Sequence, residues 1–241
     1  MGTDILTFLA LLPGIVIIIY VFRKDTVEKE PWSLIIKLLL FGALSCLPAA
    51  FVENYVTYLL PQFSPGTIAY AITEAFLVAA LWEELFKFIF LKLGSWKNRN
   101  FDYRFDGVMY GVSVAVGFAL LENLMYVATG GIGTALVRMV LAVPLHAFCG
   151  VFMGSFYSYS KLAEINGKPG AKAGFTLLAL LAPMIIHGIY DSLAFMETNA
   201  ASIALLVFVV IMYIVAVRHL KGMSKQDWQC GFYPHNRPLS Q

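Results

Sequence analysis

Charged side chains are scarce in this 241-residue chain: only 13% of its residues are Asp, Glu, Lys or Arg, about half the usual share for soluble domains. Hydrophobic residues make up 59% of the chain, and the mean hydropathy is +0.75. The net charge is only +2, and no basic stripe is interleaved with aromatic residues, so nothing indicates a nucleic-acid partner. The composition excludes an ordinary soluble domain and predicts a protein of the lipid bilayer.

Cysteine is scarce as well. Cys46, Cys149 and Cys230 lie far apart, two of them within apolar runs and one near the C-terminus. Their odd number and the absence of a CxxC spacing predict neither a disulfide framework nor a cysteine metal knuckle.

Long apolar runs, in contrast, are abundant. A helix needs about 20 apolar residues to cross roughly 30 Å of hydrocarbon. The sequence predicts seven such segments, at residues 3–22, 33–55, 69–92, 107–128, 137–159, 174–195 and 200–217. No charged segment precedes the first run and no small-residue cleavage site follows it, which favours a retained helix over a signal peptide. We therefore predict an all-α, polytopic membrane bundle with a single domain at residues 1–218 and a short tail at 219–241.

The predicted loops have the composition of turns or solvated segments. Charge, proline or glycine marks the stretches RKDTVEKEPW, PQFSPGT, GSWKNRNFDYRFD, TGGIGT and EINGKPGAK. Only METNA separates the last two predicted helices. No internal repeat or low-complexity tract accompanies these segments.

Basic residues predict the orientation, because cytoplasmic loops carry an excess of Lys and Arg. Fourteen of the seventeen Lys and Arg residues follow the first, third, fifth or seventh predicted helix. The other connections have almost none, apart from Arg138 at the edge of one of them. The N-terminus is therefore predicted outside the cell and the C-terminus in the cytoplasm.

Ionisable residues inside the predicted spans need a reason, since a charge at the bilayer centre costs roughly 2.5 to 3.5 kcal/mol even on the cheaper insertion scales. Four of them fall near helix ends, where a long side chain can reach the interface, and an interfacial role is expected for Lys37, Glu53, Glu74 and Arg138. Seven others lie deeper, namely Glu83, Glu84, Lys87, Glu122, His146, His187 and Asp191.

The stretch ALWEELFKFIF places Lys87 four residues after Glu83 and three after Glu84, so on a helix the ammonium reaches either acid. A neutralising pair that holds helices together is one reading of this pattern. Two carboxylates against one ammonium leave a surplus negative charge, however, which a structural pair does not need. The surplus favours a chemical role.

Two histidines accompany these acids on other predicted helices. His187 and Asp191 are four residues apart in HGIYD, so the carboxylate either orients the imidazole or shares a metal with it. His146, Glu122 and this pair fall in the predicted outer halves of their helices, and Glu83 lies near the middle of its own. Carboxylates with imidazoles at one depth are typical of water activation, although a proton- or cation-coupled transporter uses the same residue types. A transporter with paired repeats is disfavoured because the sequence shows none.

Four motifs occur in order on successive predicted helices. They are EExxK in EELFK, FxxxE at residues 118–122, LAVPLHAFCGVFMG around His146, and HxxxD in HGIYD. With EKEPW at the start of the second helix, they resemble the PrsW family of bacterial intramembrane proteases, which begin the degradation of anti-sigma factors. That family is distantly similar to the CAAX prenyl endopeptidases, whose second motif has His where this chain has Glu122.

The resemblance implies a multi-pass endopeptidase of the bacterial cell membrane whose partner is a single-span membrane protein, an anti-sigma factor. It places the site at Glu83, Glu84, Lys87, Glu122, His146, His187 and Asp191. The family is usually classed with metalloproteases, but there is no HExxH, and the residues leave open whether a zinc ion or a metal-free, glutamate-activated water acts. If a metal binds, His146 and His187 with Asp191 or Glu122 are the expected ligands.

We expect peptide hydrolysis in a polar cavity that opens toward the outer leaflet. Glu83 or Glu84 takes a proton from the attacking water, and Glu83 is favoured because it is nearer the bilayer centre. Lys87 holds the two acids, and Asp191 orients His187. The histidines bind metal or polarise the scissile carbonyl, and Glu122 acts as a ligand or a second base.

Overall fold

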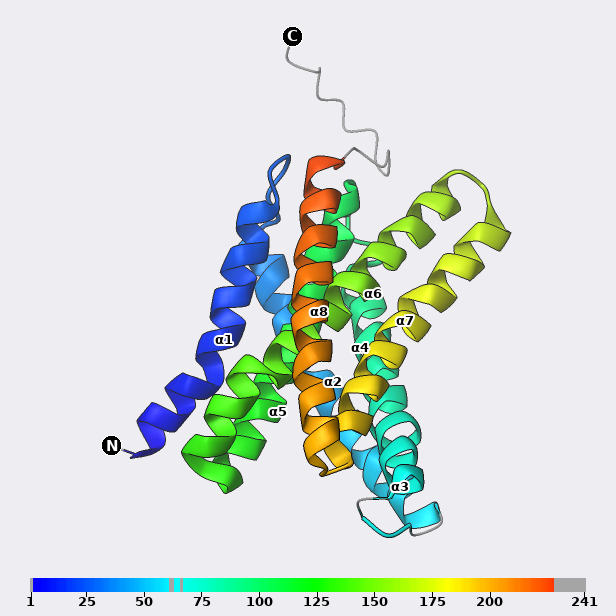
Figure 1. The fold of residues 1–241 in the computed structure, drawn as a ribbon. Helices are drawn as coiled ribbons and strands as arrows, with labels where there is room; N and C mark the ends of the chain where they lie inside the picture. Colours follow the sequence, from blue (N-terminus) through cyan, green and yellow to red (C-terminus); the bar gives the residue numbers. More distant parts are fainter. Residues whose placement is uncertain (1, 61–62, 66, 228–241) are drawn as a thin grey trace.

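The computed structural model describes residues 2–60, 63–65 and 67–227, with side chains described from residue 5 onward. Every regular element in these ranges is a helix (Figure 1). The elements are α1 (Gly2–Lys24), α2 (Trp32–Leu59), α3 (Ile68–Ile72), the π-helix η1 (Thr73–Ala80), α4 (Leu81–Ser95), α5 (Arg104–Val140), α6 (Ala142–Ile165), α7 (Pro169–Phe195) and α8 (Asn199–Lys225). The predicted all-α, polytopic class is confirmed.

Five helical stretches in the described ranges are long and apolar enough to cross a membrane. One of them, Arg104–Ile165, contains both the fourth and the fifth predicted spans. The predicted span at 69–92 is not among the five, although α3, η1 and α4 follow one another without a break. Its helical run is divided by the π-helix and carries the charged residues of EELFK. Seven spans therefore stay a prediction.

The loops that carry the basic residues gather at one end of the bundle. The α1–α2, α4–α5 and α6–α7 connections and the end of α8 all lie toward the top of Figure 1, whereas the N-terminus, α3 and the α7–α8 connection lie at the other end. This arrangement agrees with the predicted alternation of basic loops. Which end faces the cytoplasm stays a prediction from the sequence.

The stretch TGGIGT is not the loop that its glycines predict. Helical structure runs through it from both sides, and α5 turns sharply at Gly131, whose φ of 71° and ψ of −159° are open to glycine but not to ordinary residues. The residues after this kink form a short limb up to Val140, and α6 begins only at Ala142. The predicted fifth span, 137–159, therefore starts in the limb rather than in α6.

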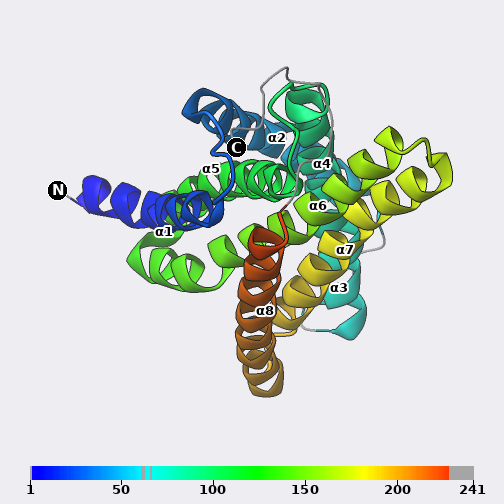
Figure 2. The same cartoon turned by 90° about the horizontal axis from the view of Figure 1, so that it is seen from above.

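Close contact between α5 and α6 brings two site-bearing helices together. A Cβ atom at Gly111 of α5 would lie 2.4 Å from the Gly150 carbonyl oxygen, and one at Gly154 of α6 would lie 2.1 Å from the Gly107 carbonyl oxygen. Small residues at a four-residue spacing allow such backbone contact between membrane helices. In the view along the bundle, α5 and α6 lie at its centre, surrounded by the other helices (Figure 2).

The π-helix η1 immediately precedes the acids of α4. Thr67 caps this helical run by accepting a hydrogen bond from the Tyr70 N–H, and the wider π-turn then ends at Ala80. Single π-turns are rare and are often found at functional sites. Here η1 leads directly into α4, whose first turn carries Glu83 and Glu84.

The predicted tail boundary at residue 218 falls inside α8, which continues to Lys225. Leu220 and Met223 are buried in the main hydrophobic core, so this end of α8 packs on the bundle. Cys230 and Arg237 lie outside the described residues.

Candidate active site

Lys87 lies at the centre of the predicted residues and is fully buried. Its ammonium donates to Glu83 Oε2 at 3.0 Å and to Glu84 Oε1 at 2.8 Å, as the helical spacing predicts. It also lies 3.0 Å from His146 Nδ1 and 3.9 Å from the centre of the Phe118 ring. The amine of the EExxK motif therefore links α4 to α5 and α6.

His146 is held between this ammonium and a carboxylate. An ammonium can only donate, so Nδ1 of His146 accepts from Lys87 and Nε2 carries the ring proton. Nε2 lies 2.9 Å from Glu122 Oε2, to which it donates. The FxxxE carboxylate thus fixes the tautomer and the orientation of His146, a common arrangement for catalytic and metal-binding histidines.

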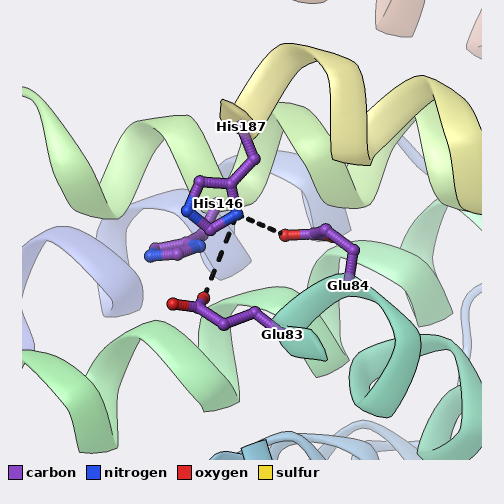
Figure 3. A group of neighbouring side chains, drawn as sticks. All are labelled: Glu83, Glu84, His146 and His187. Atoms are coloured by element: carbon purple, nitrogen blue, oxygen red, sulfur yellow. Dashed lines mark hydrogen bonds and ion pairs between the residues drawn. The ribbon is translucent and has the colours of Figure 1, made fainter. Parts of the chain in front are cut away.

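His187 is held by two carboxylates on opposite sides of its ring. Nδ1 lies 2.9 Å from Glu84 Oε1, and Nε2 lies 3.1 Å from Asp191 Oδ2. Asp191 is the partner that the four-residue spacing in HGIYD predicts. In Figure 3 the ring of His187 hangs from α7 above the two acids of α4, with His146 beside it; the ring centroids of the two histidines are 5.1 Å apart.

The two neighbouring acids differ in their surroundings. Glu84 is completely buried, and Lys87 and His187 share its Oε1 while its Oε2 has no hydrogen-bond partner. Glu83 is slightly exposed and lines a cavity of about 430 Å³ between α2, η1, α4, α5, α6 and α7. His146 and His187 line the same cavity. Of the two acids, Glu83 is therefore the one that borders the cavity.

Arg138 belongs to this site, contrary to its predicted interfacial role. Its guanidinium lies 2.7 Å from Glu122 Oε2 and 2.9 Å from Asn123 Oδ1, and it lines the cavity. The kink at Gly131 folds the limb back, which brings Arg138 to residues fifteen and sixteen positions earlier. The sequence signal was present, since Arg138 is a basic residue on the side that otherwise lacks them.

Glu53 of α2 also lines the cavity, a contact that its predicted interfacial role did not include. Its Oε1 is buried without a hydrogen-bond partner. Glu74 does not line the cavity, and Lys37 donates to the Gly94 carbonyl at 3.1 Å near the basic end of the bundle. A second cavity, of about 250 Å³ between α1, α6 and α8, is lined by no acid, amine or histidine and offers no hydrolytic chemistry.

The site carries more negative than positive side chains. Its fixed cations are Lys87 and Arg138, whereas its acids are Glu53, Glu83, Glu84, Glu122 and Asp191. Buried charges persist only when they are paired, hydrogen-bonded or bound to a cation. The surplus of acids is therefore suited to a cation or to protons held among the carboxylates.

Four buried residues provide the donor set for such a cation. Glu83, Glu84, His146 and His187 each offer one ligand atom, and these atoms lie within 4.8 Å of one another. His187 Nδ1 faces Glu84, His146 Nδ1 faces the Lys87 ammonium that bonds both acids, and both Nε2 atoms bond to outer carboxylates. Imidazole and carboxylate ligands backed by outer carboxylates are typical of catalytic zinc sites.

This arrangement distributes the expected ligands differently from the sequence prediction. His146 and His187 are in both sets, but Glu122 and Asp191 lie on the far ring nitrogens, where they orient the imidazoles. Lys87 Nζ lies within 3.0 Å of a ligand atom on Glu83, on Glu84 and on His146. The residues fit a divalent metal by donor type, provided that the Lys87 ammonium withdraws and His187 gives up its Nδ1 proton as the metal enters.

Comparison with known proteins assigns the family. Residues 30–217 match the family described as PrsW family intramembrane metalloprotease. A Protease PrsW of Geobacillus kaustophilus is 36% identical over 179 residues, which cover 74% of this chain and 75% of the relative. A Protease PrsW of Oceanobacillus iheyensis is 33% identical over 215 residues, 88% of this chain and 93% of the relative.

The Protease PrsW of Bacillus subtilis is 31% identical over 179 residues, covering 74% of this chain and 78% of the relative. No solved structure matches the chain. The matched region contains all four motifs and every residue that lines the cavity of about 430 Å³. The chain therefore belongs to the PrsW family of intramembrane metalloproteases.

Proposed function

We propose that this protein is an endopeptidase that cuts a membrane-anchored protein, an anti-sigma factor, near its extracytoplasmic juxtamembrane segment. Membership of a protease family supports hydrolysis over the alternative of a cation-coupled transporter. The observation that carries the proposal is the cavity in which Glu83, His146 and His187 meet. A carboxylate that borders the cavity beside two oriented imidazoles provides the general acid–base groups that peptide hydrolysis requires.

In this mechanism Glu83 is the general base. Its carboxylate accepts a proton from a water molecule in the cavity as the water oxygen bonds to the scissile carbonyl carbon. The same carboxyl then gives the proton to the leaving amine as the C–N bond breaks. The Lys87 ammonium donates to Glu83 Oε2 at 3.0 Å and holds the carboxylate in place between turnovers.

The remaining residues hold the two imidazoles. Asp191 accepts from His187 Nε2, so Nδ1 stays directed at the α4 acids. Glu122 accepts from His146 Nε2, so Nδ1 of that ring stays directed at Lys87. Arg138 in turn holds Glu122 through a 2.7 Å contact. These carboxylates act through the histidines and are positioning residues in this scheme.

A divalent metal, with zinc as the proposed ion, would be held by His146, His187 and Glu84, three of the four clustered donors, which leaves Glu83 to act as the base. When bound, such an ion supplies Lewis-acid polarisation of the scissile carbonyl. Glu122 and Asp191 would then keep the ligand nitrogens unprotonated on the side that faces the metal.

Metal analysis of the purified protein tests this assignment. We expect about one zinc ion per chain, loss of cleavage on removal by a chelator, and recovery on adding zinc. A variant with His146→Ala and His187→Ala should purify without the zinc. Full cleavage by chelator-treated protein in which no metal is detected would contradict the metal assignment and leave the glutamate acting on water alone.

The shape of the cavity supports the proposed side of cleavage. Its lining includes Ala194 and Phe195 at the end of α7 and Thr134 and Val137 of the α5 limb. These elements lie toward the end of the bundle opposite the basic loops (Figure 1). In the predicted orientation that end is extracytoplasmic, where an anti-sigma factor exposes its juxtamembrane segment.

Mapping the cut in a co-expressed single-span protein tests the function. We expect an anti-sigma factor to be cut at its extracytoplasmic juxtamembrane segment, and a single-span protein of equal length but unrelated sequence to stay intact. His187→Ala should abolish the product, since it removes the imidazole that joins α4 to α7. A cut on the cytoplasmic side would contradict both the orientation and the proposed role.

A further inference from the structure

A second group of acids lies at the opposite end of the bundle from the mouth of the cavity. It comes from the α1–α2 loop, the α4–α5 loop, the first turn of α5 and the segment after α8, all at the top of Figure 1. Its members, named here the acidic cluster, are Asp25, Glu30, Asp102, Asp106 and Asp227. The first four are at most 6% exposed.

Hydrogen bonds tie the four segments together around this cluster. Ser224 Oγ of α8 donates to the Lys24 carbonyl at 2.5 Å, and the Phe105 N–H donates to Asp227 Oδ1 at 2.9 Å. Tyr110 of α5 donates its hydroxyl to Glu30 Oε1 at 2.7 Å. The two loops, α5 and the end of α8 therefore meet at one point.

Some of the acids are satisfied by these and similar bonds. Asp106 Oδ2 accepts from the N–H groups of Asp102 and Tyr103, at 2.9 and 2.6 Å, and so fixes the start of α5. Those contacts are structural. They do not account for every carboxylate oxygen in the acidic cluster.

Three buried oxygens are left without a hydrogen-bond partner. They are Oδ1 and Oδ2 of Asp25, which is completely buried, and Oε2 of Glu30, which is 5% exposed. The Glu30 N–H lies close to the Asp25 carboxyl, and the Asp106 carboxyl lies close to that of Glu30, but neither contact is a hydrogen bond of ordinary geometry. Buried carboxyl oxygens without a hydrogen-bond partner are costly and call for an unseen partner.

The charges nearby show that these oxygens face other acids. Burial, followed by the charge of Asp227, raises the pKa of Asp25 to about 6. Burial raises the pKa of Glu30 to about 8, and the charge of Asp25 adds to the shift. The nearby Lys29 ammonium donates to the backbone carbonyls of Phe22 and Asp25, at 2.8 Å each, and not to a carboxylate.

We propose that the acidic cluster binds one hard divalent cation, such as Mg²⁺ or Ca²⁺, through the carboxylates of Asp25 and Glu30. Oxygen-only ligands, several of them anionic, are the donor set that these ions prefer. The ion is the missing partner of the unpaired Asp25 and Glu30 oxygens, and it links the α1–α2 loop to α5 and to the end of α8. The site is distinct from the histidine-containing cluster, which has the nitrogen donors that zinc prefers.

Mn²⁺ binding, followed by electron paramagnetic resonance, tests the proposal with full-length, chelator-stripped protein in lipid nanodiscs. The background variant carries His146→Ala and His187→Ala, so that the group of Glu83, Glu84, His146 and His187 loses its nitrogen ligands. We expect one bound Mn²⁺ that Mg²⁺ or Ca²⁺ displaces. Asp25→Asn and Glu30→Gln should each weaken binding by about tenfold or more, comparable to other losses within a metal site.

Glu28→Gln is the matched control, because Glu28 is an exposed acid of the same loop. It should leave Mn²⁺ affinity within about twofold. Thermal unfolding of the same proteins guards against misfolding: Mg²⁺ should raise the midpoint of the parent and of Glu28→Gln but not that of Asp25→Asn. Absence of Mn²⁺ binding, or binding that Asp25→Asn and Glu30→Gln leave unchanged, would overturn the proposal.

Discussion

Glu83→Gln is expected to lower the rate of substrate cleavage by about 10²- to 10⁴-fold, the usual range for loss of a general base. The amide keeps the size of the side chain but cannot take a proton from water. Because Glu83 faces the cavity and Glu84 does not, the stability of the protein should change little. The measurement is initial cleavage of a single-span substrate, with thermal unfolding recorded for each variant.

Two comparisons sharpen this test. Glu84→Gln should reduce both cleavage and the unfolding midpoint, since fully buried Glu84 accepts from Lys87 and bonds His187. Glu74→Gln, an acid of η1 that does not line the cavity, should behave like the parent. If Glu83→Gln still cleaves at close to the parent rate while Glu84→Gln is inactive and fully stable, Glu84 is the base instead.

Lys87→Met is expected to reduce the free energy of unfolding by about 3 to 5 kcal/mol, the usual cost of breaking a buried ion pair. Lys87 is completely buried, and its removal leaves the Glu83 and Glu84 carboxylates without their shared ammonium. Cleavage should be lost as well. The measurement is unfolding of the purified protein by denaturant or heat in detergent.

The double variant Lys87→Met with Glu84→Gln separates charge from packing, because it removes one of the two stranded carboxylates. It should recover part of the stability that Lys87→Met loses. Lys92→Met is the matched control, since Lys92 is exposed on the same helix. Stability of Lys87→Met equal to that of Lys92→Met would show that the ammonium is not needed to neutralise the acids.

The membrane class and the site motifs could be predicted because they depend on short-range patterns. Apolar runs of helical length identify membrane helices, and a four-residue spacing places Glu83 with Lys87 and His187 with Asp191. Both contacts are present in the structure. The meeting of Glu84 with His187, 103 residues apart, was expected only from similar depth in the bilayer.

The contacts of the site that the sequence could not predict depend on where the chain bends and on how each helix is rotated about its axis. Arg138 reaches Glu122 only because Gly131 adopts a positive φ, which a glycine permits but does not require. Hydropathy places Glu53 near a helix end, but only the packing of α2 against the other helices shows that it faces the cavity. A residue's depth follows from its position in the span, whereas the face on which it lies follows from the partners of the helix.

The sequence was sufficient to predict a helical membrane protein in which buried acids, a buried amine and two histidines pair with one another, because such groups are too costly to leave unpaired in hydrocarbon. The pairing of individual atoms follows from the packing of the helices. This packing directs His187 Nδ1 toward Glu84 and His146 Nδ1 toward Lys87, sets Glu122 and Asp191 behind the rings, and turns Glu83 rather than Glu84 to the cavity. These contacts depend on the rotation of α4, which follows η1, and on the close packing of α5 against α6. Both arise from interactions between segments that are distant in the sequence.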